Sequence, residues 1–280
     1  MSSDETAHLA CKSYELRNSD AACLLLLLHG IGRDRNQPLG ILRGRILERY
    51  AVLAPDARAH GENDLVGTAS DFSFGRMAAD VTGLIRTLGQ LEKPVYVLGF
   101  DMGAAVALRL VLMNTLDVRG VCLVSPAHCE APVPSNLRVF QELARGLQGS
   151  NVSDELRRFV ASPRYRELTS STPIQAKWLV DQFHAPDAAT RSIRFWEIPR
   201  NIAYSTPPSL SRVDPPALVV STPGRMFPKD LAATWARNLK RGHLVRESDD
   251  RATLRRTVVT DVLRTTGALT GSVNRRRWIA

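Results

Sequence analysis

The sequence has no long hydrophobic run, and this excludes several classes of protein. Its longest apolar stretch covers residues 21–28, whereas a membrane-spanning helix needs roughly 20 apolar residues. The first 20 residues are polar and acidic and lack the basic start and apolar run of a signal peptide. Glycine and proline are not concentrated in any segment, and no internal repeat is visible. We therefore expect a folded globular protein with no membrane partner.

Cysteine is scarce, and its positions do not indicate a metal site. The four cysteines, Cys11, Cys23, Cys122 and Cys129, show no metal-ligand spacing. Two of them stand in apolar, strand-like segments, where a free cysteine acts as a small hydrophobic residue. We expect no metal, no cofactor and a reducing, cytoplasmic location.

Lysine is also scarce, although the net charge is +9, because only five of the 37 basic residues are lysines. This preference for arginine is typical of a high-GC bacterial genome. A basic balance can indicate nucleic acid or an anionic membrane as a partner. Here the arginines are scattered, and the one tight cluster, residues 275–277, lies in a basic C-terminal tail at 271–280. With no nucleic-acid-binding signature present, we expect no nucleic-acid partner. The oligomeric state stays open.

What the chain does have is an alternation of apolar strands and amphipathic helices. We predict strands at Ala21–Leu28, Ala51–Ala54, Val95–Leu98, Val121–Val124, Ala217–Val220 and His243–Arg246. The helices predicted between and after them are Pro38–Tyr50, Phe74–Leu91, Gly103–Met113, Lys229–Leu239 and Arg251–Leu263. Such alternation predicts an α/β fold with a mostly parallel sheet flanked by helices.

The pattern changes between residue 126 and about residue 215, where apolar positions become sparse and no strand is evident. Helices are plausible at Asn136–Leu147, Ser153–Leu168, Ile174–Phe183 and Ala188–Trp196. We therefore predict a core formed by residues 1–125 and 215–270, with residues 126–214 inserted as a helical cap.

One segment, residues 95–105 (VYVLGFDMGAA), has the context of a nucleophile elbow. A strand leads into Gly99, Asp101 and Gly103, and an apolar helix follows directly. The central residue of such an elbow sits on a sharp, strained turn. The glycines are needed because the backbone and the helix approach too closely for a side chain.

Two further motifs strengthen this interpretation. His-Gly-Ile-Gly at residues 29–32 follows the first long strand, and Asp-Ala-Arg-Ala-His-Gly at residues 56–61 follows the second. With the elbow, they make the chain resemble the α/β-hydrolase superfamily, and the resemblance extends over nearly the whole chain. It implies an oxyanion hole formed by the backbone N–H groups of Ile31 and Met102. It also implies that Asp101 points into a pocket between core and cap.

An aspartate at the elbow resembles the haloalkane dehalogenases and epoxide hydrolases of this superfamily. In those enzymes the carboxylate attacks carbon and a histidine-activated water cleaves the resulting ester. This chain departs from both patterns. Met102 stands where dehalogenases usually carry tryptophan, and Ile31 and Gly32 stand where epoxide hydrolases usually carry a proline.

The other two positions of a hydrolase triad are less complete. Gly224 and Arg225 stand where the family carries its acid, and Glu130 is an alternative acid after the preceding strand. His243 looks like the late Gly-His of the family and is a catalytic candidate. The spacing, however, puts it at the start of the last strand. The loop after that strand, residues 248–250, has no histidine.

Other histidines could compensate for the missing one. His128 lies just past the end of a predicted strand, at the edge of the sheet where such sites form, and is a second catalytic candidate. His29 and Gly30 adjoin the implied oxyanion hole. Trp178 and His184 belong to the predicted cap. We take these last four residues as candidates for substrate binding.

Three function classes remain open. The first is a non-hydrolytic enzyme of the lyase, cyclase or isomerase type, with Asp101 as general acid or base. The second is a hydrolase with Asp101 as covalent nucleophile, of the dehalogenase, epoxide hydrolase or esterase type. The third is a binding protein without catalysis. The incomplete triad disfavours the second class, and the retained His-Gly, elbow and cap disfavour the third. We therefore favour the first class, with a small organic substrate that we expect, by analogy alone, to be a secondary metabolite.

Overall fold

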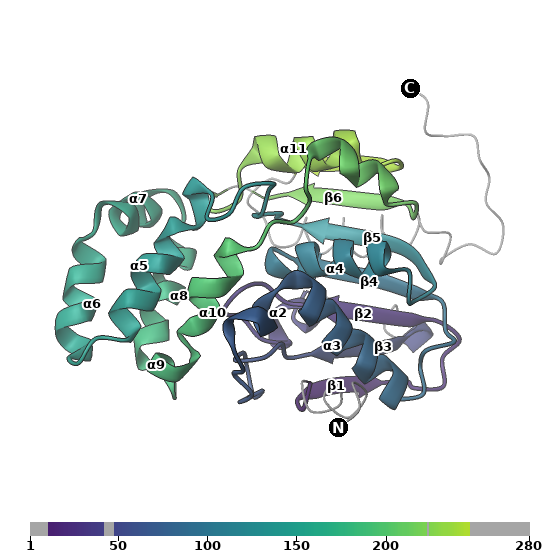
Figure 1. Ribbon diagram of the computed structural model, residues 1–280, viewed down its shortest axis with the longest axis horizontal. Helices are drawn as coiled ribbons and strands as arrows, with labels where there is room; N and C mark the ends of the chain where they lie inside the picture. The colour runs from purple at the N-terminus through teal and green to yellow at the C-terminus, as the bar shows by residue number, and fades with distance from the viewer. Residues whose placement is uncertain (1–10, 42–47, 223, 247–280) are drawn as a thin grey trace.

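The computed structural model describes residues 11–41, 48–222 and 224–246, and a seven-stranded sheet runs through them. Its order is β1-β3-β2-β4-β5-β6-β7; β1 is antiparallel to β3 and all other pairs are parallel. The strands are β1 (Tyr14–Arg17), β2 (Leu24–Leu28), β3 (Ala51–Pro55), β4 (Val95–Phe100), β5 (Val118–Val124), β6 (Ala217–Ser221) and β7 (Gly242–Arg246). The predicted α/β-hydrolase fold, with a mostly parallel sheet flanked by helices, is confirmed (Figure 1).

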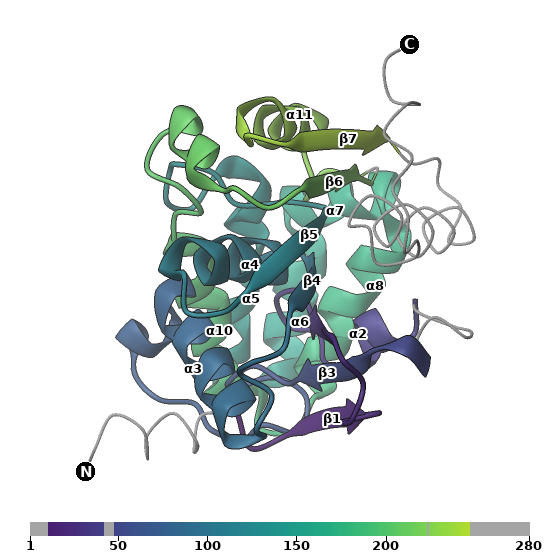
Figure 2. The same cartoon turned by 90° about the vertical axis from the view of Figure 1, so that its right-hand side faces the viewer.

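The central strands are continuous apolar runs because both of their faces are covered. In β2, Leu24, Leu26 and Leu28 pack into one hydrophobic cluster, and the two leucines between them pack into another. This is the two-residue alternation of a pleated strand. Helices α3 (Phe74–Thr87) and α4 (Met102–Met113) lie on one side of the sheet and α2 (Asn36–Leu39) on the other (Figure 2). Helix α11 (Lys229–Asn238) packs against β6 and β7.

A helical lobe, defined here as residues 135–200, is inserted between β5 and β6. It extends beyond the carboxyl ends of the strands, at the left in Figure 1. Its helices are α5 (Arg138–Leu147), α6 (Val152–Ala161), α7 (Pro163–Ser171), α8 (Pro173–Asp181), α9 (Ala188–Arg191) and α10 (Ile193–Glu197). Short 3-10 turns are η2 (Ala69–Phe72), before α3, then η3 (Ser135–Leu137), η4 (Gln182–His184) and η5 (Ile198–Arg200) within the lobe, and η6 (Pro207–Arg212) after it.

Two arginines of the lobe attach it to the core. The Arg194 side chain is buried and donates to the backbone carbonyl of Ala59 and, at 2.9 Å, to Oε1 of Gln182. Arg191 donates to the carbonyl of Gly61 over 2.8 Å. Both acceptors on the core belong to the turn after β3, so the lobe is fixed to the same edge of the sheet as the elbow.

The sequence-based prediction was wrong at three places, one of which is the single helix expected over Ala188–Trp196, observed as α9 and α10. A single helix over Ser153–Leu168 was expected, but the chain breaks at Ser162. That residue has extended backbone angles, and its hydroxyl accepts from the N–H of Tyr165 to cap α7. Pro163 then occupies the first turn of α7, where its missing N–H costs nothing. Strand β1 was missed because it is only partly buried and carries no apolar run.

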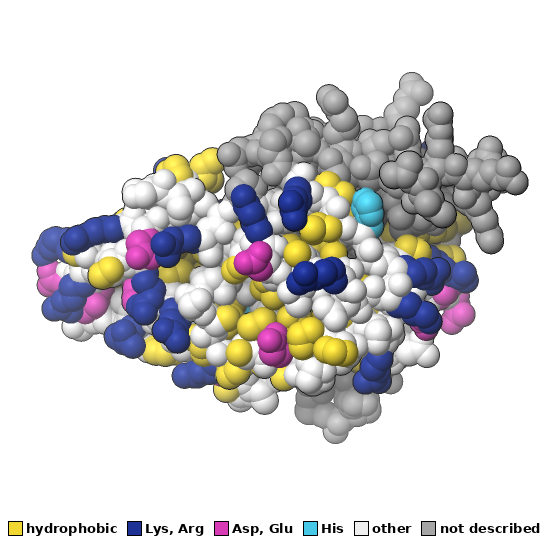
Figure 3. Space-filling view, turned by 90° about the horizontal axis from the view of Figure 1, so that it is seen from above, with side chains coloured by type: hydrophobic (Ala, Val, Ile, Leu, Met, Phe, Trp, Pro, Cys, Tyr) yellow, Lys and Arg dark blue, Asp and Glu magenta, His cyan; other side chains and the backbone are white. Residues whose placement is uncertain are grey.

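Several predicted elements lie outside the described residues. They are most of the helix predicted at Pro38–Tyr50, of which α2 is the described start, the helix at Arg251–Leu263 and the tail at residues 271–280. The second part of the core is described as far as residue 246. On the face shown in Figure 3, the described basic side chains are interspersed with acidic and apolar ones and do not form one patch. No helix in the described ranges is long and apolar enough to cross a membrane.

Candidate active site

Asp101 sits on a strained turn between β4 and α4. Its backbone has φ 50° and ψ −107°, a conformation that non-glycine residues rarely adopt. The glycines beside it allow the close approach. A Cβ on Gly99 would lie 2.3 Å from the carbonyl oxygen of Gly103, and a Cβ on Gly103 would lie 2.5 Å from that of Leu28. The elbow geometry is therefore present, with a carboxylate at its apex.

The order of the strands puts this apex beside the His-Gly turn. Strand β2 lies between β3 and β4 in the sheet. After β2 the chain continues into α2 on one face of the sheet, and after β4 it continues into α4 on the other face (Figure 2). A crevice therefore forms at the carboxyl ends of these two strands. There the N–H of Ile31 donates to Oδ2 of Asp101 at 3.2 Å, and the N–H of Met102 lies close enough to the carboxyl group to lower its pKa. The two amides expected to form an oxyanion hole thus converge, but on the side chain of Asp101 itself.

The environment of Asp101 changes its acidity. The side chain is only 8% exposed, and burial raises the pKa of Asp101 to about 7. The amides of Ile31 and Met102 act in the opposite direction because they stabilise the charged form, and so does the cation of Arg33. Desolvation is the larger effect, so Asp101 changes protonation state near neutral pH.

Of the two catalytic histidine candidates, the structure brings only His128 close to Asp101. Its Nδ1 lies 3.9 Å from Oδ1 of Asp101, a contact longer than a hydrogen bond. The imidazole is fully buried and packs edge-on against Phe74, with ring centroids 4.8 Å apart. Burial lowers the pKa of His128 to about 3, so the ring is neutral.

The polar atoms of His128 and Asp101 that face each other lack hydrogen-bond partners in the described part of the chain. Neither ring nitrogen of His128, nor Oδ1 of Asp101, forms a hydrogen bond of normal geometry with any described residue. The backbone of Ile198 approaches the imidazole without meeting that geometry. Buried polar atoms without partners are rare in proteins. Oδ2 of the carboxyl group accepts from the amide of Ile31, while Oδ1 faces a neutral imidazole.

The structure does not bring the remaining histidine candidates to this site. His243 begins β7 and pairs with Leu218 near the start of β6. In a parallel sheet this is the edge opposite Asp101, so His243 cannot act as its catalytic partner. His184 is exposed on η4. His29 is buried, its Nε2 accepts from the N–H of Ala57 at 3.0 Å, and its Nδ1 lies 2.8 Å from the carbonyl of Gly30. His29 therefore links the loop after β2 to the loop after β3 and has no ring nitrogen left for a substrate.

The candidate acids also lie away from the carboxylate. Glu130 is exposed, and it lies close enough to Tyr204 to raise the pKa of that phenol. Gly224 and Arg225 carry no carboxylate, and Arg225 pairs with Glu167 of the lobe at 2.7 Å. Residues 248–250 lie outside the described residues.

A cavity of about 730 Å³ lies between the core and the helical lobe and reaches Asp101. Gly30 and Trp178, two of the predicted substrate-binding residues, line it. Sequence reasoning missed the hydroxyl groups of Ser125 and Thr222, whose oxygens are 2.6 Å apart on the cavity wall. Each directly follows a parallel strand, and that position was the available signal.

Arg33 is a further lining residue that the sequence did not reveal. Its guanidinium carbon lies 4.3 Å from the ring centroid of Trp178, a cation–π contact between the core and the helical lobe. Among the residues the structure describes, no group of three or more His, Cys, Asp or Glu side chains could hold a metal ion. The carboxyl group of Asp101 can transfer a proton or attack carbon as a nucleophile.

Known proteins resemble this chain in sequence. A profile described as the alpha/beta hydrolase family matches residues 25–257. Protein phosphatase methylesterase 1 of Rattus norvegicus is 31% identical over 127 residues, which cover 44% of this chain and 32% of the rat protein. An uncharacterized protein of Mycobacterium tuberculosis is 28% identical over 120 residues, covering 43% of this chain and 33% of that protein. The matched part is about a third of the length of these curated relatives.

Solved structures share the fold at low sequence identity. The alpha/beta hydrolase MGS-M2, from a Medee basin deep-sea metagenome library, has a TM-score of 0.70 at 15% identity, over 94% of this chain and 96% of that one. The enol-lactonase from Burkholderia xenovorans LB400 has a TM-score of 0.67 at 18% identity, over 90% of this chain and 96% of that one. At such identities the likeness concerns the fold alone.

Proposed function

The chain belongs to the alpha/beta hydrolase family, and we propose that it is an enzyme in which Asp101 transfers a proton to or from a small organic substrate. The reaction class that fits is non-hydrolytic: a lyase, cyclase or isomerase. The substrate occupies the cavity between the core and the helical lobe, which acts as a cap. No cofactor takes part in this proposal.

The observation that carries the proposal is the asymmetric setting of the Asp101 carboxyl group. Oδ2 accepts from the N–H of Ile31, whereas Oδ1 has no hydrogen-bond partner among the described residues. The pKa of about 7 leaves both protonation states populated at neutral pH. A general acid or base works best when its pKa lies near the operating pH. Below pH 7 Asp101 can donate a proton, and above it the carboxylate can accept one.

The same geometry disfavours an acyl-transfer mechanism of the ordinary kind. Such a mechanism needs the amides of Ile31 and Met102 to bind the oxyanion of the substrate. Both amides already interact with the Asp101 carboxylate. In the proposed reaction they stabilise the anion that forms when Asp101 gives up its proton. His128, neutral and 3.9 Å away, adds no charge that would drive the pKa back down.

The experiment is hydron exchange with a panel of small carbonyl compounds in D₂O, followed by NMR. Exchange at the carbon next to the carbonyl reports proton transfer even when the complete natural reaction is unknown. We expect the exchange rate to inflect near pH 7 and to fall by roughly 10²–10⁴-fold in Asp101→Asn. The exposed variant Asp181→Asn is the control. Exchange that persists in Asp101→Asn would remove Asp101 from the reaction.

A second function is supported by the 3.9 Å approach of His128 to Asp101. Contacts of catalytic pairs are often long without substrate, so this histidine could activate water against an ester on Asp101. The likeness to a methylesterase adds esters to the possible substrates. In this mechanism, His128→Leu should trap a covalent adduct with a short bromoalkane or epoxide on the peptide that contains Asp101. Absence of the adduct, together with no halide or diol release by the wild type, would reject the hydrolase.

A further inference from the structure

The cavity combines one cation with aromatic and neutral polar walls. Among its described lining residues, Arg33 is the only basic one, and the acids are Asp34 and Asp101. The neutral polar groups include the side chains of Gln37 and Gln182. Phe140, Trp178, Met226 and Phe227 supply apolar surface.

The position of Arg33 is fixed by the loop that carries it. The N–H of Arg33 donates to the carbonyl of Gly30 at 3.1 Å, which closes a turn around Ile31. Gly32, at φ +67°, allows this turn to pack closely against the lobe. A Cβ at this position would lie 2.5 Å from Trp178 and 2.8 Å from Phe195. This closely packed loop carries Arg33, whose guanidinium carbon lies over the Trp178 ring.

A guanidinium that lies over an aromatic ring can also bind an anion. A cation–π contact does not consume its N–H donors, whose planar arrangement matches a carboxylate. Arg33 also acts on the reacting group, because its cation lowers the pKa of Asp101. The same turn thus presents a cation to the cavity and an amide to the Asp101 carboxylate.

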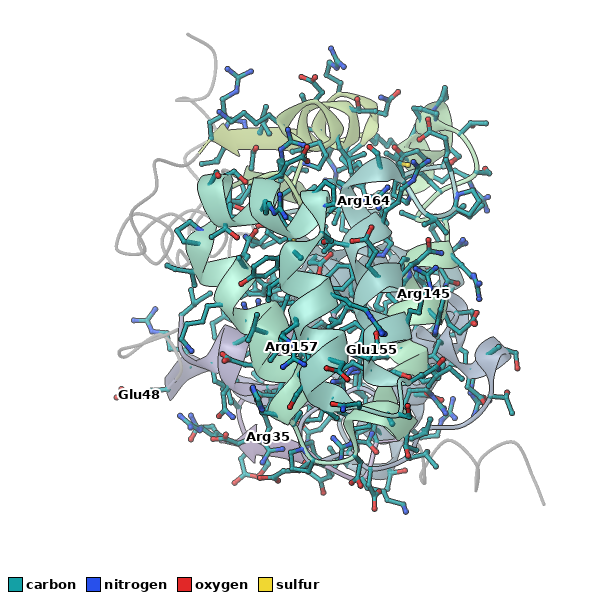
Figure 4. The ribbon with its side chains drawn as sticks, turned by 90° about the vertical axis from the view of Figure 1, so that its left-hand side faces the viewer. Arg35, Glu48, Arg145, Glu155, Arg157 and Arg164 are labelled. Carbon is teal, nitrogen blue, oxygen red and sulfur yellow. The ribbon has the colours of Figure 1, made fainter. Side chains whose placement is uncertain are left out.

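Three other arginines in or near the lobe form ion pairs and do not line the cavity. Figure 4 shows Arg157 and Arg164 on the outer face of the lobe, where they pair with Asp154 and Glu142. Arg35, two residues from Arg33, pairs with acids of the core. None of these three lines the cavity as described. Arg157 therefore serves as a matched control for a change at Arg33.

We propose that the cavity takes an organic acid, with the carboxylate of the ligand on the guanidinium of Arg33 and its apolar body against Phe140, Met226 and Phe227. This inference rests on the proposed function in that the ligand would be the substrate of Asp101. The binding step itself does not require Asp101 to be catalytic. An anion at Arg33 would offset the cation that lowers the pKa of Asp101, so binding near pH 7 should take up protons.

The test compares three carboxylates, benzoate, 2-naphthoate and decanoate, with their uncharged amides, by calorimetry at pH 7. We expect at least one carboxylate to bind roughly tenfold to a hundredfold more tightly than its amide, as a charge-assisted contact would give. Arg33→Gln should abolish this preference, Arg33→Lys should keep part of it, and Arg157→Gln should leave it unchanged. Circular dichroism of Arg33→Gln and Arg33→Lys checks that each variant is folded.

Two results would overturn the proposal: no carboxylate preference in the wild type, or an undiminished preference in folded Arg33→Gln. Calorimetry in buffers of different ionisation enthalpy supplies a second readout, since proton uptake should disappear in Asp101→Asn while binding remains. If Asp101→Asn keeps hydron exchange but Arg33→Gln loses the carboxylate preference, the acid/base function is rejected and the proposed ligand class is supported. If Asp101→Asn loses hydron exchange but Arg33→Gln keeps the carboxylate preference, the ligand class is rejected and the acid/base function is supported.

Discussion

Replacement of Asp101 by asparagine should stabilise the protein, and by an amount that depends on pH. Asparagine is uncharged at every pH, nearly isosteric, and able to accept the N–H of Ile31 through its side-chain carbonyl. The wild-type carboxyl group has an ordinary pKa of 3.8 and a pKa of about 7 in the folded protein. The folded state therefore binds the proton more tightly than the unfolded state does.

The direction in which stability changes with pH follows from this difference in proton affinity. The stability that protonated Asp101 contributes is complete below pH 3.8 and is lost as the pH rises to about 7. Above pH 7 the buried charge should cost about 4 kcal/mol of unfolding free energy, because each pKa unit corresponds to about 1.4 kcal/mol. At pH 5 the cost should be about 2 kcal/mol. The advantage of Asp101→Asn should therefore grow by roughly 2–3 kcal/mol between pH 5 and pH 8.5.

Urea unfolding followed by tryptophan fluorescence at the two pH values measures this change. Trp235 is fully buried and reports on the core. Asp181→Asn is a suitable control, because Asp181 is an exposed partner of Lys177 at 3.2 Å and its replacement should give a nearly constant difference. An Asp101→Asn advantage that is equal at both pH values would refute a raised pKa. An advantage that shrinks with pH would reverse the sign of the argument.

Two further predictions concern the neighbours of Asp101. His128→Leu replaces a neutral, fully buried ring without normal hydrogen bonds, so the unfolding free energy should change by less than about 1.5 kcal/mol in urea titration. In the same variant the hydron-exchange inflection near pH 7 should remain, and its disappearance would mean that His128 and Asp101 titrate as a pair. Gly103→Ala should lower the melting temperature strongly, because its Cβ meets the Leu28 carbonyl oxygen at 2.5 Å. Gly75→Ala in α3, with nothing within 4 Å of its Cβ, should be neutral or stabilising by up to about 1 kcal/mol, and equal effects at the two glycines would contradict the steric explanation.

Much of the fold could be predicted because local sequence and global packing agree. The apolar run that contains β2 predicts a strand buried on both faces, and the structure has one. The spacing before His243 predicts that it begins the last strand, which is where it lies. The helix break at Ser162 escaped prediction because apolar positions continue across it, and only the capping hydroxyl and Pro163 mark the boundary.

The candidate site could be predicted in part. The elbow glycines and the His-Gly turn identified Asp101 and the amide of Ile31, since backbone positions follow from the motif. The side-chain arrangement did not follow. Whether the Asp101 carboxylate accepts from Ile31 depends on a rotamer, and the contact between Arg33 and Trp178 joins residues 145 positions apart. The choice of His128 over His243 needed the strand pairing, which fixes the edge of the sheet that each residue occupies.

The aspartate at the elbow also determines which other groups the site needs. A serine at this position needs a base to remove its proton, and the family supplies one from the loop after the last strand. No histidine occurs between residues 247 and 280 of this sequence. A carboxylic acid ionises without a partner base, so Asp101 does not depend on that distant loop. Replacing Asp101 with serine would leave the amide of Ile31 without its acceptor. Serine hydrolysis at this site would therefore need a histidine within hydrogen-bond reach of the new hydroxyl as well as the serine itself.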